Sequence, residues 1–470
     1  MLNSKLFAAL CLIMAGPAIE AQKSVTPLPD APGLVAQAPP PAVAPDTPSA
    51  SVPPTTPLGP VLTRQQAEQL ALKNNPHISV AGLIALAQKQ VVRETRSAYY
   101  PTLNGELTGV RAEEDSRLST GSLTASSLLN HAGGGVTVTQ LITDFGRTRN
   151  LVASSSFQSK ASDQQSQAAR EDIVVATDFA FYQALEAQAT LQVARSTVNA
   201  RQAVKDQVSA LTASKLKSTL DQSFAQVNLS EAQLLTLNAQ NQYDSAMASL
   251  NEVLGTTDDT QFNLVDDLSP PAPVATTADG VIALALQQRP DLLALKLTHD
   301  ADVRFARAQR DQLLPTISGL GVVGATPWDP NTTTTTYFLE PWYGAAGVNV
   351  RIPIFNGFKF HSEAEGADLL AKASDEQSRV LIDRIVRDVR TAWLTMNTAQ
   401  QRITVTTQLL KEANTALDLA GTRYRLGLSS IVELSQAQLQ QTQAQIDQAN
   451  AQFEYEADLA ALRFQSGSQP

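Results

Sequence analysis

An internal duplication constrains this chain more than any other feature of its sequence. ALKNNPHI at 71–78 matches ALQQRPDL at 285–292, and YPTLNG at 100–105 matches LPTISG at 314–319, both at the same displacement along the chain. GVTVTQLITD at 135–144 matches GVNVRIPIFN at 347–356 at a displacement shorter by two residues. This net change falls between the matches, where a loop tolerates it. The sequence is therefore two copies of one unit of about 200 residues.

Most of the elements predicted in each copy are helices. We place the copies at 62–276 and 277–467. Helical runs at about 63–98 and 277–312 end at Pro101 and Pro315, since proline cannot continue a helix. Stretches almost free of Gly and Pro then predict longer helices of about 65 residues, which span about 100 Å and favour coiled-coil-like packing. These longer helices lie at about 147–214 and 360–426, followed by second helices at 219–254 and 431–465.

Alternating residues between the helices predict two strands in each copy. In TLNGELTGV, Leu103 and Leu107 share one face, while Asn104 and Glu106 share the other. The predicted strands lie at about 102–112, 134–144, 315–325 and 338–354. The first three are near the length of about 9–11 residues that crosses an outer-membrane bilayer, and the fourth is longer. The expected fold class is α+β with mostly long helices and four strands per chain.

Four strands are too few to close a barrel by themselves. An open strand edge cannot face lipid, because each unpaired N–H or C=O group there costs several kcal/mol. Either the strands form a soluble sheet, or several chains contribute to one barrel. The aromatic residues favour a barrel shared by several chains, because they gather near strand ends, where side chains of the membrane interface are found. These residues are Tyr99, Tyr100, Trp328, Tyr337, Phe338, Trp342 and Tyr343.

The chain begins with a predicted signal peptide and a proline-rich segment. Lys5 precedes a short apolar run followed by small residues, which predicts a signal peptide over 1–21. Residues 22–61 have few large apolar groups to bury and predict an extended tether. The only cysteine, Cys11, lies in the signal peptide, so we expect no disulfide. No later stretch has the length of a transmembrane helix, and the formal net charge of −10 argues against nucleic-acid binding.

Taken together, several stretches resemble the TolC family of outer-membrane efflux and secretion channels. YYPTLNG, LITDFGRTR and YRLGLSSIVELSQAQLQ carry the resemblance, which covers about 62–467. It implies a homotrimer in the bacterial outer membrane, with a 12-stranded barrel that continues into an α-helical barrel across the periplasm. It also implies a periplasmic adaptor and an inner-membrane transporter as partners. The implied function is efflux of small molecules, with type I protein secretion as the alternative.

The resemblance further places a gate at the periplasmic tip of the tube. The gate candidates are Glu433, Asp221, Tyr424, Gln436, Arg425 and Lys217. The adaptor is expected to dock on the tip turns, which contain Lys215, Leu216, Gly427, Leu428 and Ser429. Ser429 and Gln436 depart from the family pattern, which has an arginine and an acid there. Three copies of Glu433 around a narrow axis would attract cations. The alternative is that Glu433 and Asp221 are only solvated or N-terminal helix carboxylates.

No pattern in the chain predicts an enzyme, a cofactor or a metal site. GLGVVG at 319–324 matches the dinucleotide-binding fingerprint, but that motif needs a helix after it, and ATPWDP follows instead. The four histidines are scattered, without a pair at metal-binding spacing. Two other readings stay open. A coiled-coil envelope scaffold leaves the strands unexplained, and a substrate-specific porin leaves the long helices unexplained.

Overall fold

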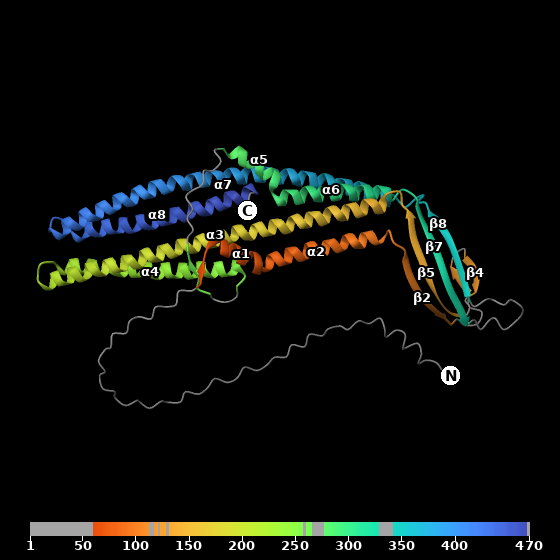
Figure 1. Ribbon diagram of the computed structural model, residues 1–470, viewed down its shortest axis with the longest axis horizontal. Coiled ribbons are helices and arrows are strands. Elements are labelled where there is room, and N and C mark those ends of the chain that lie inside the picture. Colours follow the sequence, from red (N-terminus) through yellow and green to blue (C-terminus); the bar gives the residue numbers. More distant parts are fainter. Residues whose placement is uncertain are drawn as a thin grey trace, which may run out of the picture. The chain divides into compact units, whose positions relative to one another are not determined.

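The computed structural model describes residues 60–111, 117–120, 123–127, 131–256, 260–265, 277–328 and 342–467 (Figure 1). The predicted signal peptide and nearly all of the predicted tether lie outside these residues. In the described part, long helices extend away from a four-stranded sheet, which lies at one end (Figure 1). None of the described helices combines the length and apolar character of a membrane span.

Two helical hairpins make up most of the helical part. α3 (Arg147–Ala213) is followed by α4 (Thr219–Leu254), and α7 (Lys359–Arg425) is followed by α8 (Ile431–Ser466). α3 and α7 both have 67 residues, and α4 and α8 both have 36. The second hairpin therefore repeats the first, with no insertion or deletion between the start of α3 and the end of α4. The predicted helices agree with these bounds to within about one residue.

Buried or half-buried side chains, most of them small, recur every seven residues along the helical seams. A seven-residue period keeps one face of a helix turned toward its neighbour, and small side chains let the backbones approach closely. On α4 the series is Ala225, Ala232, Ala239 and Ala246. On α7 it is Ala364, Ala371, Ser378, Ile385, the half-buried Ala392, Ala399, Thr406, Ala413 and Ala420. The coiled-coil-like packing expected from the sequence is therefore present.

A break divides each of the shorter helical runs, which we had expected to be continuous. α1 (Arg64–Asn74) and α2 (Pro76–Ser97) meet at Asn75, whose ψ of 123° is extended. α5 (Ala278–Gln288) and α6 (Pro290–Asp311) meet at Arg289, whose ψ is 121°. The physical reason is that proline disfavours helical geometry in the residue before it. The prediction of single helices over 63–98 and 277–312 was therefore wrong.

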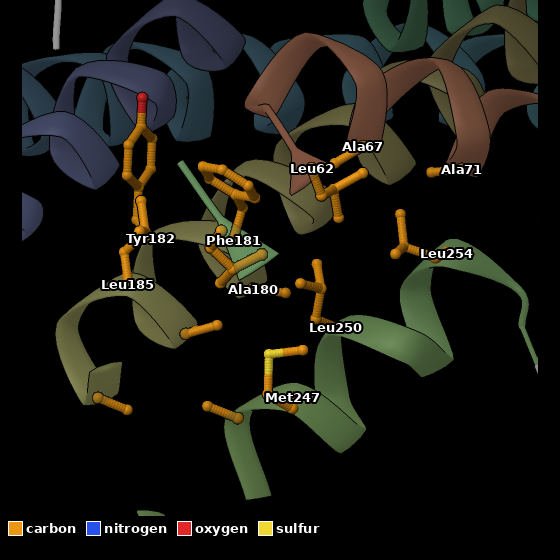
Figure 2. Packing of buried hydrophobic residues seen from close by; sticks show 14 residues of the cluster. Leu62, Ala67, Ala71, Ala180, Phe181, Tyr182, Leu185, Met247, Leu250 and Leu254 are labelled. Carbon is orange, nitrogen blue, oxygen red and sulfur yellow. The ribbon is translucent and has the colours of Figure 1, made fainter. Parts of the chain in front are cut away.

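The beginning of the described chain is held against α3 and α4. β1 (Val61–Leu62) pairs in parallel with β6 (Asn263–Leu264), and α1 follows directly. Figure 2 shows Leu62 and the α1 residue Ala67 pointing toward Phe181 of α3 and Leu250 of α4. All four of these side chains are at most 2% exposed. This apolar cluster anchors α1 to the first hairpin.

A buried polar contact accompanies that cluster. Arg64 of α1 forms an ion pair with Glu68, and its Nη1 lies 3.5 Å from Oδ1 of Asp178 on α3. Asp178 is only 4% exposed. Burial, together with the nearby Glu68 carboxyl, raises the pKa of Asp178 to about 7, against the attraction of Arg64. The contact between α1 and α3 therefore depends on a titratable group.

The main sheet joins the two repeats. Its order is β2-β5-β7-β8, and every neighbouring pair is antiparallel. The strands are β2 (Thr102–Val110), β5 (His131–Thr143), β7 (Thr316–Trp328) and β8 (Trp342–Arg351). A separate hairpin of β3 (Arg117–Thr120) and β4 (Leu123–Ser127) lies between β2 and β5 in the chain. β7 extends three residues past the predicted end, and β8 ends three residues before the predicted end at 354; the predicted residues 338–341 lie outside the described part.

The two faces of the sheet differ in polarity. The strand register places Leu103, Val138, Gly321 and Ala346 across one face, and Leu107, Val136, Val323 and Val348 share it. The other face carries Asn104, Glu106, Thr137, Ser318 and Asn349. One face is therefore apolar and the other is mainly polar, which is the pattern of a sheet with lipid on one side and water on the other.

Candidate functional site

Both hairpins turn through the same backbone motif at the end farthest from the sheet (Figure 1). Lys215 and Gly427 occupy equivalent positions, with φ of +62° and +74°. The Leu216 N–H donates to the Leu211 carbonyl at 2.9 Å, and the Leu428 N–H donates to the Arg423 carbonyl at 2.8 Å. These bonds satisfy carbonyls left open at the helix ends, as in a Schellman motif. Glycine adopts this conformation without strain, but lysine does not.

The two predicted gate carboxylates lie in the first turn of the helix that follows each hairpin turn. Asp221 completes a capping box, in which its N–H donates to Ser218 Oγ at 3.2 Å and its carboxylate accepts the Ser218 N–H at 3.2 Å. The Glu433 N–H donates to Ser430 Oγ at 3.4 Å, while the Glu433 carboxylate lies 3.3 Å from Arg423 Nε. Asp221 thus takes part in capping through both its N–H and its carboxylate, whereas Glu433 does so only through its N–H, and a gate role for the two carboxylates stays a prediction.

Tyr424 connects the two hairpins near their turns. It is 4% exposed and packs with Val208, Ala225, Ile431 and Leu434, which come from both hairpins. Lys217 Nζ lies 4.2 Å from the centroid of the Tyr424 ring, a cation–π contact between one turn and the other hairpin. Burial, with a smaller contribution from Asp221, raises the pKa of the Tyr424 hydroxyl. Lys217, Asp221 and Tyr424 thus form one cluster.

The structure does not bring all the gate candidates into this cluster. Arg425 is exposed and donates to Thr422 Oγ1 at 3.2 Å. Gln436 lines a groove between α7 and α8. A second link between the hairpins was not predicted from the sequence, and in it Asn228 Nδ2 donates to Ser435 Oγ at 2.6 Å. No local pattern marks this pair, because the two residues lie in different repeats.

The remaining turn residues differ in their surroundings. Leu216 and Leu428 project into solvent, with 71% and 67% of each residue exposed. Ser429, which stands where the family pattern has arginine, is half-buried, and its Oγ is buried without a hydrogen-bond partner in the described part of the chain. The turns thus present two exposed leucines at equivalent positions.

The predicted interface aromatics separate into three groups. Tyr99 and Tyr100 follow α2 and are 46% and 70% exposed, and Trp342 lies on the apolar face with 69% exposure. Tyr343 lies on the polar face instead, where its ring occupies the space above Gly324. Tyr343 thus lies on the opposite face of the sheet from Trp342, and the interface role of these aromatics stays a prediction. Tyr337, Phe338 and the side chain of Trp328 lie outside the described residues.

Two sequence patterns could suggest a ligand site among the described residues. No group of three or more His, Cys, Asp or Glu side chains in the described ranges is placed to hold a metal ion. Gly319 and Gly321 of the apparent dinucleotide fingerprint lie within β7, and the strand continues to Trp328. The features that remain are the two-faced sheet and the cluster that joins the hairpin turns.

Comparisons with known proteins agree with this arrangement. The family model described as outer membrane efflux protein matches residues 67–256 and 281–468. Outer membrane protein TolC of Salmonella enteritidis is 22% identical over 412 residues, which cover 86% of this chain and 81% of that protein. Outer membrane efflux protein BepC of Brucella suis biovar 1 (strain 1330) is 24% identical over 380 residues, 78% of this chain and 77% of that protein.

The fold is also that of a solved channel structure. A crystal structure of CusC, reported in connection with transmembrane channel formation, superposes with a TM-score of 0.75 at 19% identity, over 86% of this chain and 92% of that chain. The family match covers most of this chain in two blocks, one in each repeat. The chain is therefore a member of the outer membrane efflux protein family and resides in the bacterial outer membrane.

Proposed function

We propose that three copies of this chain form a channel that carries small molecules across the outer membrane from a pump spanning the periplasm. The sheet is the main support for this proposal. Its edge strands β2 and β8 each pair with one strand, β5 or β7, and the outer edge of each has no partner in the described part of the chain. Unpaired edges are costly in lipid. If β8 of one copy pairs with β2 of the next, the antiparallel alternation continues without interruption.

Exposed apolar helix faces support contact between copies. On α2, Val80, Leu83 and Ile84 are 54%, 65% and 57% exposed and recur at helical spacing. On α7, Leu369 and Leu370 are 58% and 65% exposed. Apolar surface of this kind marks an interaction site, and a neighbouring copy would remove it from water.

The contacts at the hairpin turns support the proposal that the channel opens at its periplasmic tip. We assign the contact between Lys217 and Tyr424 to the closed channel, because it ties one hairpin to the other. Glu433 would face the axis, and its partner Arg423 would moderate the repulsion among three copies. The exposed Leu216 and Leu428 offer apolar anchors for a periplasmic adaptor, behind which an inner-membrane transporter would supply the cargo.

Two measurements on purified protein test the proposal. The mass of the detergent-solubilised particle should correspond to three chains, and the same particles should conduct ions in planar bilayers. A water-soluble single chain without conductance would overturn the proposal. Deletion of the gene should raise the cellular accumulation of small-molecule dyes. Loss of a secreted protein with unchanged dye accumulation would favour type I secretion instead.

A further inference from the structure

A groove of about 840 Å³ lies where α3, α7 and α8 meet, and no residue of α1 or α5 lines it. Part of its wall is aromatic, with Phe179 and Tyr182 from α3 and Phe453 from α8. Phe179 is 43% exposed, so its ring is available to a ligand in the groove. The volume lies within the range of about 300–1,000 Å³ that is typical of small-molecule sites.

The groove also carries an excess of negative charge. Glu186 comes from α3, and Asp447, Glu454 and Asp458 come from α8. The only basic side chain in the lining is Arg402 of α7, which forms an ion pair with Glu454. Three carboxyl groups thus remain without a cation in the lining.

One of these carboxyl groups also lacks a hydrogen bond. Asp458 Oδ2 is buried and has no hydrogen-bond partner among the described residues. Burial, followed by repulsion from Glu454, raises the pKa of Asp458 to about 6 and also raises the pKa of Glu186. The groove therefore favours a donor that brings positive charge.

The other repeat shows that these charges are not needed to fold the hairpins. When the first residue of α3 is aligned with the first residue of α7, every charged position of the groove corresponds to a neutral residue. Glu186 corresponds to Thr398, Arg402 to Thr190, Asp447 to Leu235, Glu454 to Gln242 and Asp458 to Ala246. The helices concerned have the same lengths in both repeats. The acidic set is therefore specific to this groove rather than part of the repeated architecture.

We propose that the groove binds an organic cation with an aromatic or apolar body, such as a protonated amine. The ammonium N–H groups would donate to the accessible carboxylate oxygens that line the groove, and the apolar body would lie against Phe179 and Phe453. The inference rests on the proposed function, because it narrows the cargo of the channel to a chemical class. It differs from the tip cluster in place and in chemistry.

Dansylcadaverine is a suitable probe, because it joins a primary ammonium to a fluorescent aromatic ring. Its fluorescence anisotropy with the detergent-solubilised full chain should report binding, and its N-acetylated neutral derivative should bind at least about tenfold more weakly. Asp458→Asn should weaken binding about tenfold, and lowering the pH through about 6 should also weaken it. Arg402→Gln should strengthen binding several-fold by freeing Glu454, an effect opposite in sign to structural damage. Asp206→Asn, an exposed carboxylate elsewhere on α3, serves as the matched control.

Equal affinity for the charged and neutral probes would overturn the inference, as would unchanged affinity in both Asp458→Asn and Glu454→Gln. Conductance of the same preparation separates this failure from failure of the proposed function. Conducting trimers that do not bind the cationic probe would refute the groove alone. Binding without conductance would refute the channel and leave the groove standing.

Discussion

The left-handed residue at each hairpin turn permits a quantitative test of the equivalence of the two repeats. Lys215 and Gly427 share one backbone conformation, with φ of +62° and +74°. A residue with a Cβ loses about 1–2 kcal/mol in this region relative to glycine. Glycine also has a larger conformational entropy in the unfolded chain, and this offsets about 0.5 kcal/mol of its advantage. At Gly427 an added Cβ meets no atom within 4 Å, so steric contact adds nothing there.

Glycine is therefore favoured over a residue with a Cβ by about 1 kcal/mol at each turn. Because only the second turn has glycine, substitutions at the two turns should change the stability in opposite directions. Lys215→Gly should stabilise the first turn, and Gly427→Ala should destabilise the second by a similar amount. A change of about 1 kcal/mol corresponds to about a fivefold change in the equilibrium constant for local opening. The variant Gly366→Ala, in the interior of α7 where a Cβ also meets nothing within 4 Å, is the matched control.

Hydrogen exchange followed by mass spectrometry measures these local openings. In Lys215→Gly, the peptide containing the Leu216 amide should exchange about fivefold more slowly. In Gly427→Ala, the peptide containing the Leu428 amide should exchange about fivefold faster, and Gly366→Ala should leave both turns unchanged. Changes of the same sign in both turn variants would refute the reasoning, as would a rate in Lys215→Gly that stays within twofold of the unmodified chain.

Three further predictions concern the tip and the α1 contact. Lys217→Met removes the cation–π contact with Tyr424, which contributes about 0.5–1 kcal/mol. The variant should therefore raise the open fraction of channels in planar bilayers about twofold to fivefold. An unchanged open fraction would argue against a closing role for this contact. Glu433→Gln should reduce cation block and cation preference in reversal-potential measurements; unchanged selectivity would place Glu433 away from the constriction. Raising the pH from about 4 through about 7 should weaken docking of α1, because the native state keeps a proton on Asp178 that the unfolded segment has already lost. Exchange of α1 amides, corrected for intrinsic rates, should therefore accelerate over that range, and Asp178→Asn should abolish the acceleration; a flat profile in the unmodified chain would contradict this.

The long helices and the strands could be predicted because their signals are local. The absence of proline over 67 residues of α3 and α7 marks uninterrupted helix, and alternation of apolar and polar residues marks the strands. The breaks at Asn75 and Arg289 also had a local signal in the prolines that follow them. A proline inside a helical run is a helix boundary, because it drives the residue before it out of helical geometry.

The tip could be predicted only in part. The spacing of Ser218 and Asp221 is that of a capping box and was readable from the sequence. The burial of Tyr424, in contrast, depends on how two hairpins about 200 residues apart in the chain pack together. The same limit applies to the hydrogen bond between Asn228 and Ser435, which come from different hairpins. Likewise, the face on which Tyr343 lies follows from the strand register.

The central claim is that neighbouring copies complete the sheet by joining β8 of one chain to β2 of the next. Within one chain these strands are separated by β5 and β7, so they lie about 14 Å apart at about 4.8 Å per step. A disulfide requires Cα atoms about 4.4–6.8 Å apart, so cysteines on β2 and β8 can bond only between copies. Cysteine pairs scanned along the polar face, beginning with Asn104→Cys and Asn349→Cys, should yield a covalent species of three chains on oxidation in the membrane. Recovery of single chains alone from every pair in the scan would contradict the account.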